Sequence, residues 1–298
     1  MTATIDTDLA HHTAQVDGGV NLHYVEAGQG PLVVLLHGFP AFWYDWREQI
    51  PALAAAGFRV VAPDMRGYNL SAKPRGVAAY RTEVLARDVA RLISACGAER
   101  ASVVGHDWGA GVAWSFAMLY PDLLERLAIL NVPHPVTLRR GLKRLRQLRK
   151  SWYIFFFQLP WLPEALVRVR GHAFVRRALE RDPMRPGAYS ASDIALYVKA
   201  LAQPGALTAT INYYRALFRY GPQAMRNLRR IEAPVLVIWG DHDRYLGREL
   251  ASPDPVWVPN VRVEHLPNAS HWVHVDDPER VNELLVTFLR GRPTLSPR

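Results

Sequence analysis

Asp107 lies at the centre of a glycine-flanked pattern that could place a nucleophile on a sharp turn. The apolar residues 101–104 predict a buried strand, and residues 108–119 predict a helix that follows almost immediately. Gly105 and Gly109 stand two positions either side of Asp107, where larger side chains would collide as the chain reverses. The pattern is G-x-D-x-G, with aspartate where this type of turn usually carries a serine nucleophile. A simpler interpretation is that Asp107 only caps the following helix.

An aspartate at this position restricts the chemistry. Its carboxyl group is expected to be ionised near neutrality, because the reference pKa is about 3.9 and a helix start favours negative charge. Asp107 could therefore attack without a base. Attack on an ester or amide would produce a reactive anhydride, whereas attack on an sp3 carbon with a leaving group produces a stable alkyl ester. The residue type therefore indicates an epoxide, a haloalkane or a haloacid as substrate.

Two further titratable residues follow predicted strands. Asp243 comes just after residues 234–239, and His271 comes just after residues 261–266. A histidine that is oriented by an aspartate can deprotonate a water molecule, which would then hydrolyse an ester on Asp107. We therefore predict that Asp107 is the nucleophile, His271 the general base and Asp243 the orienting acid.

Neighbouring residues compete for these roles. His106 precedes the turn residue, so its side chain should point away from the tip of the turn. His242 and His274 lie beside the candidate acid and the candidate base. Asp241 is nearer its strand than Asp243 and could instead hold the loop by an Asx turn.

Strand and helix patterns alternate along much of the chain. Residues 13–27 alternate about an Asp-Gly-Gly turn and predict an antiparallel hairpin at a sheet edge. A continuous apolar run predicts a strand buried on both faces at 31–36, and further strands are predicted at 58–62, 101–104, 126–130, 234–239 and 261–266. Helical patterns lie between or after them at 46–56, 81–95, 108–119 and 278–289. Such alternation predicts an α/β fold with a mostly parallel, doubly wound sheet.

The alternation stops between residues 131 and 135. From there to about Leu228 the pattern is helical and rich in arginine and aromatic residues. We predict an α/β core formed by residues 1–133 and 229–298, with an all-helical cap of residues 134–228 inserted into it. An insertion that follows a strand lies over the carboxyl ends of the sheet, where ligands of α/β proteins bind.

The composition is that of an ordinary globular protein, with 298 residues, 49% hydrophobic and 21% charged. The single cysteine, Cys96, cannot form an internal disulfide, so nothing in the sequence requires an oxidising compartment. Residues 1–12 do not have the pattern of a signal peptide, and no apolar run approaches the roughly 20 residues of a membrane span. We expect a cytoplasmic protein.

The net charge of +9 is unevenly distributed, and seven of the twelve residues from Arg139 to Lys150 are basic. Leu142, Leu145 and Leu148 recur every third residue within this segment, so we expect a helix that packs through its leucines and leaves its arginines in water. Weak, peripheral attraction to anionic membranes is the further possibility. No nucleic-acid-binding motif accompanies the segment.

The order of nucleophile, acid and histidine along the chain resembles that of the α/β-hydrolases. The segment Trp239-Gly240-Asp241-His242-Asp243 is similar to the family pattern W-G-x-x-D, which implies Asp243 as the acid. Some relatives carry the acid after the sixth strand. That position is Asn131 here, and an amide cannot serve as the acid.

Four segments resemble those of epoxide hydrolases with an aspartate nucleophile: His37-Gly38-Phe39-Pro40, Asp64-Met65-Arg66-Gly67-Tyr68, Ser151 to Gln158 and Asn212-Tyr213-Tyr214-Arg215. The resemblance implies that Tyr153 and Tyr214 donate protons to the epoxide oxygen. It also implies that the backbone N–H groups of Phe39 and Trp108 form an oxyanion hole. Asn69 stands where the family often has glycine, but asparagine tolerates a left-handed conformation.

The sequence therefore predicts an epoxide hydrolase that converts a small apolar epoxide and water to a vicinal diol. We expect Phe39, Pro40, Trp108 and Trp272 to contact the substrate. No cofactor and no metal are expected, and the oligomeric state is left open.

Two alternatives remain at this point. The first is a dehalogenase that uses the same aspartate. It is disfavoured because Phe39 stands where many haloalkane dehalogenases have asparagine, and because the arginines of the haloacetate enzymes are replaced by Trp108 and Gly111. The second is a binding protein without turnover, which would usually lack part of the triad or the proton donors.

Overall fold

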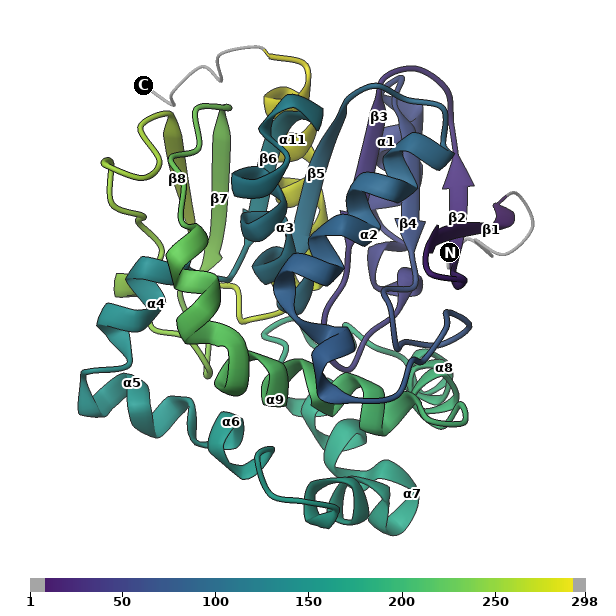
Figure 1. The fold of residues 1–298 in the computed structure, drawn as a ribbon, viewed down its shortest axis with the longest axis vertical. Helices are drawn as coiled ribbons and strands as arrows, with labels where there is room; N and C mark the ends of the chain where they lie inside the picture. Colours follow the sequence, from purple (N-terminus) through teal and green to yellow (C-terminus); the bar gives the residue numbers. More distant parts are fainter. Residues whose placement is uncertain (1–8, 292–298) are drawn as a thin grey trace.

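The computed structural model describes residues 9–291, which form an eight-stranded sheet in the order β1-β2-β4-β3-β5-β6-β7-β8 (Figure 1). Strands β3 to β8 run parallel to their neighbours, while β1 and β2 add an antiparallel edge. The strands are β1 Ala10–Asp17, β2 Val20–Ala27, β3 Leu32–Leu36, β4 Arg59–Pro63, β5 Ala101–His106, β6 Leu124–Leu130, β7 Val235–Gly240 and β8 Val261–Leu266. The predicted mostly parallel sheet and its edge hairpin are confirmed.

Helices cover both faces of this sheet, which explains why β3, β5 and β7 are buried along their whole length. Residues of α2 (Thr82–Ala95) and α3 (Trp108–Leu119) belong to one hydrophobic core. Residues of α1 (Gln49–Ala55) and α11 (Pro278–Leu289) belong to a second core on the opposite face. A strand between two cores has no polar face, and the sequence accordingly shows unbroken apolar runs at these strands.

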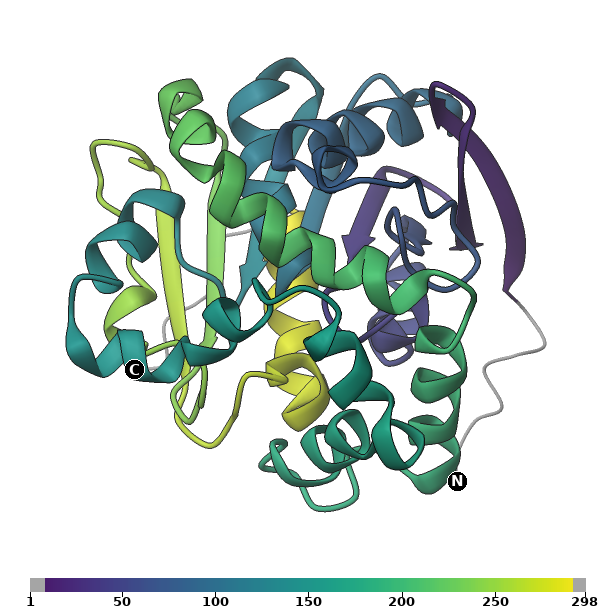
Figure 2. The same ribbon diagram turned by 60° about the horizontal axis from the view of Figure 1, so that its bottom comes forward.

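The helices between β6 and β7 form the cap: α4 Pro135–Gly141, α5 Leu145–Lys150, α6 Trp152–Phe156, α7 Leu162–Arg181, α8 Ala191–Leu201 and α9 Ala206–Ala224. Figure 2 shows α9 crossing the end of the sheet, with the other cap helices around it. Helix α9 joins cap and core, because Tyr213 lies in the first hydrophobic core and Tyr214 in the second. The Tyr213 hydroxyl also donates to the carbonyl oxygen of Arg66 at 2.6 Å.

The basic segment differs from the sequence expectation. It forms two short helices, α4 and α5, and Leu145 and Leu148 remain 72% and 37% exposed. The buried residue of α5 is Gln147, whose side-chain amide donates to Ser151 Oγ and accepts from the backbone N–H of Gly247. The prediction that these leucines pack on the domain is therefore wrong. The hydrogen bonds of Gln147 turn a different face of the six-residue helix inward.

Among residues 9–291, no helix has both the length and the apolar character that crossing a membrane requires. Cys96 is buried and free. Residues 1–8, which belong to the segment without a signal-peptide pattern, and residues 292–298 of the predicted core lie outside the described residues.

Candidate active site

Asp107 lies on a strained turn between β5 and α3. Its φ of 49° and ψ of −124° fall in a region that non-glycine residues rarely occupy. A Cβ atom at Gly109 would overlap the carbonyl oxygen of Leu36, and one at Gly105 would overlap the backbone of the first helical turn. Both small residues of the G-x-D-x-G pattern are therefore required by the backbone. The Asp107 side chain makes no capping hydrogen bond to α3, so the simpler interpretation of this residue does not describe its position.

The Asp107 carboxylate is held between the loop after β3 and the loop after β8. The backbone N–H of Phe39 donates to Oδ1 at 2.7 Å, and Nε2 of His271 lies 3.4 Å from Oδ2. Burial raises the pKa of Asp107, but the neighbouring His271 outweighs burial, with smaller contributions from His106 and the Phe39 N–H. The net effect lowers the pKa below its ordinary value. The carboxylate is therefore charged at neutral pH.

His271 bridges the two aspartates. Its Nδ1 lies 2.7 Å from Oδ2 of Asp243, and its Nε2 faces Asp107. Burial lowers the pKa of His271, but the two carboxylates outweigh burial and raise it to about 10. His271 is accordingly protonated when both carboxylates are charged.

Asp243 has a dense set of hydrogen-bond donors. The backbone N–H groups of Tyr245 and Leu246 donate to Oδ1 at 2.7 and 2.8 Å. The side-chain amide of Asn131 donates to Oδ2 at 2.8 Å. Burial raises the pKa of Asp243, but His271 and these donors hold it below its ordinary value. The carboxylate that faces His271 is thereby fixed in both charge and orientation.

Asn131 is a site residue that the sequence interpretation discarded. It follows β6 with a φ of 52°, and its side-chain oxygen accepts from the Gly240 N–H at 2.9 Å. An amide cannot replace the acid, but it can donate to the acid in the loop after the neighbouring strand, β7. In the sequence, the position of Asn131 directly after a predicted strand is the feature that could have indicated a role at the site.

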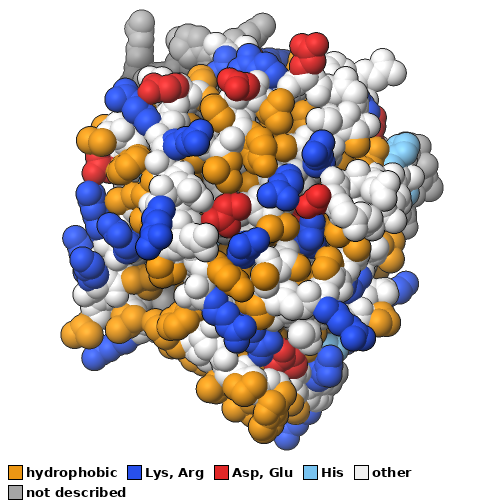
Figure 3. Space-filling model, viewed as in Figure 1, with side chains coloured by type: hydrophobic (Ala, Val, Ile, Leu, Met, Phe, Trp, Pro, Cys, Tyr) orange, Lys and Arg blue, Asp and Glu red, His pale blue; other side chains and the backbone are white. Residues whose placement is uncertain are grey.

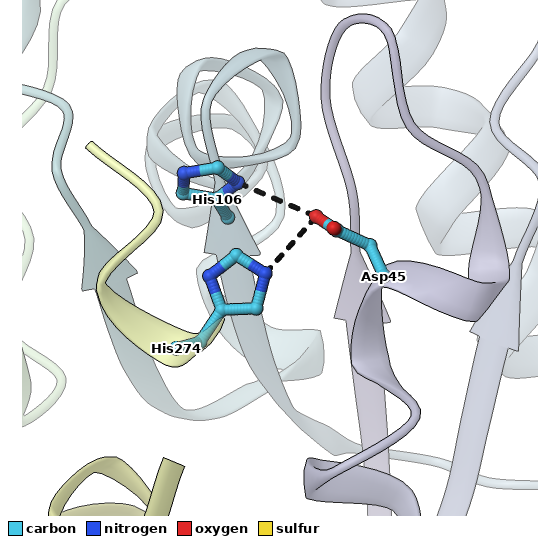
Figure 4. Close-up of side chains that lie close together, drawn as sticks. All are labelled: Asp45, His106 and His274. Atoms are coloured by element: carbon cyan, nitrogen blue, oxygen red, sulfur yellow. Dashed lines mark ion pairs between the residues drawn. The ribbon is translucent and has the colours of Figure 1, made fainter. Parts of the chain in front are cut away.

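The other residues that the sequence offered for the acid and the base lie outside the group formed by Asp107, Asp243 and His271. Asp241 faces His265, with an oxygen 2.6 Å from its Nδ1, on the outer side of the loop. His242 is exposed. His106 and His274 lie beside Asp45 (Figure 4).

Two tyrosines of the cap face the carboxylate. Tyr153 of α6 and Tyr214 of α9 line a cavity of about 200 Å³ together with Asp107 and His271. Their ring centroids are 5.8 Å apart. Burial, reinforced by the charge of Asp107, raises the pKa of both phenols. Both hydroxyls therefore remain protonated at neutral pH and can donate hydrogen bonds.

The remaining cavity wall is largely aromatic. Of the expected substrate contacts, Phe39, Pro40 and Trp272 line this cavity. Trp108 instead lines a second cavity of about 160 Å³, which shares Asp107, Tyr153 and Tyr214 with the first. The other residues around the first cavity are Trp152, Phe157, Phe174, Val175, Ala178 and Tyr245. Asp107 and the two tyrosines therefore stand where two apolar cavities meet.

Tyr245 is a second residue that the sequence interpretation missed. Its ring lies edge-on to His271, with centroids 5.3 Å apart, and it also contacts Tyr153. Its hydroxyl donates to Asp182 in the loop after α7. It therefore connects the candidate base to the cap.

Known proteins are similar to this chain over most of its length. A family profile described as alpha/beta hydrolase fold matches residues 31–278. The chain is 43% identical over 277 residues to AB hydrolase superfamily protein YfhM of Bacillus subtilis (strain 168), covering 92% of this chain and 96% of that protein. It is 36% identical over 282 residues to epoxide hydrolase 4 of Homo sapiens, covering 92% of this chain and 77% of that protein.

A solved structure supports the same relationship. A mutant epoxide hydrolase from Bacillus megaterium superposes with a TM-score of 0.84 at 33% identity, covering 94% of this chain and 100% of that chain. Both the sequence relatives and the structural neighbour extend across core and cap. The chain therefore belongs to the epoxide hydrolases of the α/β-hydrolase fold.

Proposed function

We propose that this protein hydrolyses an apolar epoxide to a vicinal diol through an alkyl ester on Asp107. The observation that carries the proposal is the convergence of one carboxylate and two protonated phenols on one apolar cavity. A carboxylate can open the ring at carbon, while phenols can stabilise the oxygen that remains attached to the substrate.

In the first step, the Phe39 N–H holds Oδ1 of Asp107, and Oδ2 attacks an epoxide carbon. A C–O bond forms as the ring C–O bond breaks, and the released electron pair moves to the epoxide oxygen. Tyr153 and Tyr214 donate hydrogen bonds to that oxygen, and one of them supplies the proton that gives a hydroxyl group. Charge develops on this oxygen only as the ring opens, so these donors stabilise the transition state more than the ground state.

The second step depends on a change in the pKa of His271. In the free protein the two carboxylates raise this pKa to about 10. Formation of the ester removes the negative charge of Asp107, so one of the two groups that favour the protonated histidine is lost. The pKa of His271 then falls, its proton passes to the phenolate left by the first step, and the neutral ring becomes available as a base. Asp243 continues to hold Nδ1 and leaves Nε2 toward the ester.

Neutral His271 takes a proton from water, and the resulting hydroxide attacks Cγ of the Asp107 ester. The tetrahedral intermediate places negative charge on Oδ1, where the Phe39 N–H already donates. The Trp108 N–H, at the start of α3, is the second proposed donor. Collapse of the intermediate breaks the bond between Cγ and the substrate oxygen. That oxygen takes the proton of the new carboxyl group, so the diol leaves, the Asp107 carboxylate is restored and His271 keeps the proton that it took from water.

The aromatic lining favours an apolar epoxide as substrate. Aromatic and aliphatic side chains surround Asp107 in both cavities, so polar groups on the substrate would lose hydration without replacement. A halide leaves without taking a proton. The two phenols would therefore have no role in a dehalogenase.

Activity assays test the proposal directly. Purified protein is incubated with a panel of aryl and alkyl epoxides and a matched panel of haloalkanes. We expect diol from at least one epoxide and no halide release, and Asp107→Ala serves as the inactive control. Halide release without diol formation would favour the dehalogenase, and no turnover of either panel would favour a binding protein.

We further propose the division into a core of residues 1–133 and 229–298 and a cap of residues 134–228. This division is supported by the position of all cap helices between β6 and β7. A cytoplasmic location remains a prediction from the single cysteine.

We also propose weak, peripheral contact between the cap and anionic membranes. Residues 134–228 contain 17 Lys and Arg against 4 Asp and Glu, a net charge of +13, whereas the whole chain carries +9 and the remainder therefore −4. Exposed aromatic residues accompany this charge, with Trp152 and Trp161 exposed by 58% and 73%. Figure 3 shows hydrophobic and basic side chains interspersed over the lower part of the molecule, where Figure 1 places the cap. Basic and aromatic side chains together are typical of surfaces that bind lipid headgroups.

The active-site cavity opens toward this surface. Trp152 and Phe174 both line the cavity and both are exposed. A cap that rests on a membrane would bring the mouth of the cavity close to the layer in which apolar epoxides concentrate.

A further inference from the structure

Asp45, His106 and His274 form a cluster of fully buried polar side chains that do not line either cavity at the candidate active site (Figure 4). Asp45 belongs to the 3-10 helix Trp43–Trp46, His106 ends β5 and His274 lies in α10 (Val273–Asp276). Oδ2 of Asp45 lies 3.0 Å from Nε2 of His274 and 3.6 Å from Nδ1 of His106. Three segments distant in the sequence thus direct one oxygen and two nitrogens toward one another.

These three atoms are close but do not form hydrogen bonds. Oδ2 of Asp45, Nδ1 of His106 and Nε2 of His274 have no hydrogen-bond partner among the described residues. The contact between Asp45 and His274, at 3.0 Å, is short enough for a hydrogen bond but its direction does not suit one, and the contact between Asp45 and His106, at 3.6 Å, is too long. Buried polar atoms are nearly always paired, because desolvation without a partner is unfavourable. The cluster therefore requires an explanation other than packing.

One hydrogen bond shows which ring nitrogen of His106 carries the hydrogen. Its Nε2 lies 2.9 Å from the carbonyl oxygen of His271. A carbonyl oxygen can only accept, so Nε2 carries the hydrogen and donates it. In the neutral ring the lone pair is then on Nδ1, where it faces the Asp45 carboxylate. Two lone pairs directed at each other in a buried site repel, unless a proton or a metal cation lies between them.

The outer contacts of His106 and Asp45 are those that metal ligands usually have, whereas Nδ1 of His274 has no hydrogen-bond partner among the described residues. Metal-binding histidines commonly donate their other ring N–H to a carbonyl or carboxylate, which fixes the tautomer. His106 does this with His271. The second carboxylate oxygen of Asp45, Oδ1, accepts from the hydroxyls of Tyr197 and Tyr189 at 2.6 and 3.2 Å. Oδ1 is thereby satisfied, and Oδ2 remains for a cation.

The spacing also fits a small divalent cation. Zinc binds imidazole nitrogen and carboxylate oxygen at about 2.0–2.2 Å in tetrahedral geometry, so two of its ligand atoms lie roughly 3.3–3.6 Å apart. The distances from Asp45 Oδ2, 3.0 and 3.6 Å, lie on either side of the lower value. All three ligand atoms lie within 4.8 Å of one another. Small shifts of the side chains would place each at bonding distance from one ion.

We propose that Asp45, His106 and His274 bind a divalent transition metal, with zinc as the best fit to two imidazoles and one carboxylate. This site takes no part in the ester mechanism and does not depend on the proposed function. The ion would tie the loop after β3, the end of β5 and the segment after β8 together. Through the hydrogen bond of His106, it would hold the backbone of His271 in place. The sequence interpretation expected no metal, because nothing local connects Asp45 with two histidines so far along the chain.

Metal analysis of purified protein tests the proposal. The chain is expressed in medium supplemented with zinc, dialysed against a chelator and analysed by elemental mass spectrometry. We expect about one zinc per chain in the wild type, since a buried structural ion exchanges only with unfolding. His274→Gln, which removes a ligand but keeps a polar side chain of similar size, should hold less than about one tenth of an equivalent.

His265→Gln is the matched control. His265 also lies beside an aspartate, with Nδ1 2.6 Å from Asp241, but it is partly exposed and, within residues 9–291, belongs to no cluster of three possible metal ligands. This variant should retain zinc as the wild type does. Zinc retained by His274→Gln, or lost equally from both variants, would overturn the assignment.

A second measurement applies if His274→Gln does not fold. Cobalt replaces zinc during expression, and the visible absorption of tetrahedral cobalt reports the ligand field in the wild type and in His265→Gln. The melting temperature of the loaded protein should fall when a chelator is present during heating, because a captured ion cannot restabilise the folded state. A wild type with neither bound metal nor a chelator-sensitive melting temperature would show that the cluster is a protonated ion pair instead.

Discussion

Nε2 of His271 lies 3.4 Å from Oδ2 of Asp107, so the candidate base faces the candidate nucleophile directly. This contact has opposite consequences before and after the ester forms. In the free protein, Asp107 helps to keep His271 protonated. In the ester, that contribution is lost, and the same short distance places the base beside the water that must attack.

The raised pKa of His271 predicts a pH-dependent contribution to stability. Burial lowers this pKa, but Asp243 and Asp107 raise it to about 10, above its value of about 6.5 in an unfolded chain. The folded state then binds the proton more tightly, so its stabilisation is complete below pH about 6.5 and is lost as the pH rises through about 10. We expect the melting temperature of the wild type to exceed that of His271→Gln at pH 6 and the difference to shrink steadily toward about pH 10. A difference that does not change with pH would contradict the position of His271 between two charged carboxylates.

The ester mechanism predicts the origin of the diol oxygen. In a single turnover with excess protein in ¹⁸O-labelled water, Asp107 supplies the attacking oxygen, and water enters only at its Cγ. The first diol released should therefore carry no label, and the label should be found in the Asp107 carboxylate by peptide mass spectrometry. Label in that first diol would mean that water attacks the epoxide directly.

Substitution of the two central residues should stop the reaction at different stages. His271→Gln retains the nucleophile but lacks the base, so its intact mass should rise by the mass of the substrate and remain raised. Asp107→Ala should form no adduct. The measurement is intact-protein mass spectrometry over time with a substrate of the wild type. An unmodified His271→Gln protein after long incubation would count against the two-step scheme.

The two cap tyrosines distinguish epoxide from halide chemistry. Loss of one hydroxyl should cost roughly 2–4 kcal/mol of transition-state stabilisation, the range for a single oxyanion donor. Tyr153→Phe or Tyr214→Phe should therefore slow single-turnover alkylation by an epoxide about a hundredfold or more. Tyr213→Phe is a neighbouring control, because its hydroxyl donates to Arg66 rather than facing the cavity. If Tyr153→Phe and Tyr214→Phe both alkylate at the wild-type rate, the two tyrosines only pack within the cap and do not donate to the epoxide oxygen.

The charge of the cap predicts salt-sensitive membrane binding. Sedimentation with phosphatidylglycerol vesicles at low salt should deplete the protein from solution, whereas high salt or phosphatidylcholine vesicles should not. Trp161→Ala should weaken binding, because Trp161 is an exposed aromatic of the cap. Val256→Ala, at an exposed apolar position of the core, should not weaken it. The absence of salt-sensitive binding to phosphatidylglycerol vesicles would identify the basic segment as an ordinary solvated surface.

The features that could be predicted from the sequence are either local patterns or consequences of a parallel sheet. Strands between two hydrophobic cores need unbroken apolar runs, and the turn at Asp107 needs glycines at fixed distances, so both leave a signal within a few residues. The convergence of Asp107, Asp243 and His271 was also predictable, because parallel strands bring the residues after their carboxyl ends to one edge of the sheet.

Tertiary structure alone decided which side chains meet across that edge. Asn131 and Asp243 are 112 positions apart, and their hydrogen bond depends on β6 and β7 being neighbours. The exposure of Leu145 likewise depends on Gln147, whose partners lie in a loop about a hundred residues away. The cluster of Asp45, His106 and His274 joins three elements with no shared sequence pattern. Periodicity shows which face of an element is apolar, but the partner of a buried polar atom is set only when distant segments pack together.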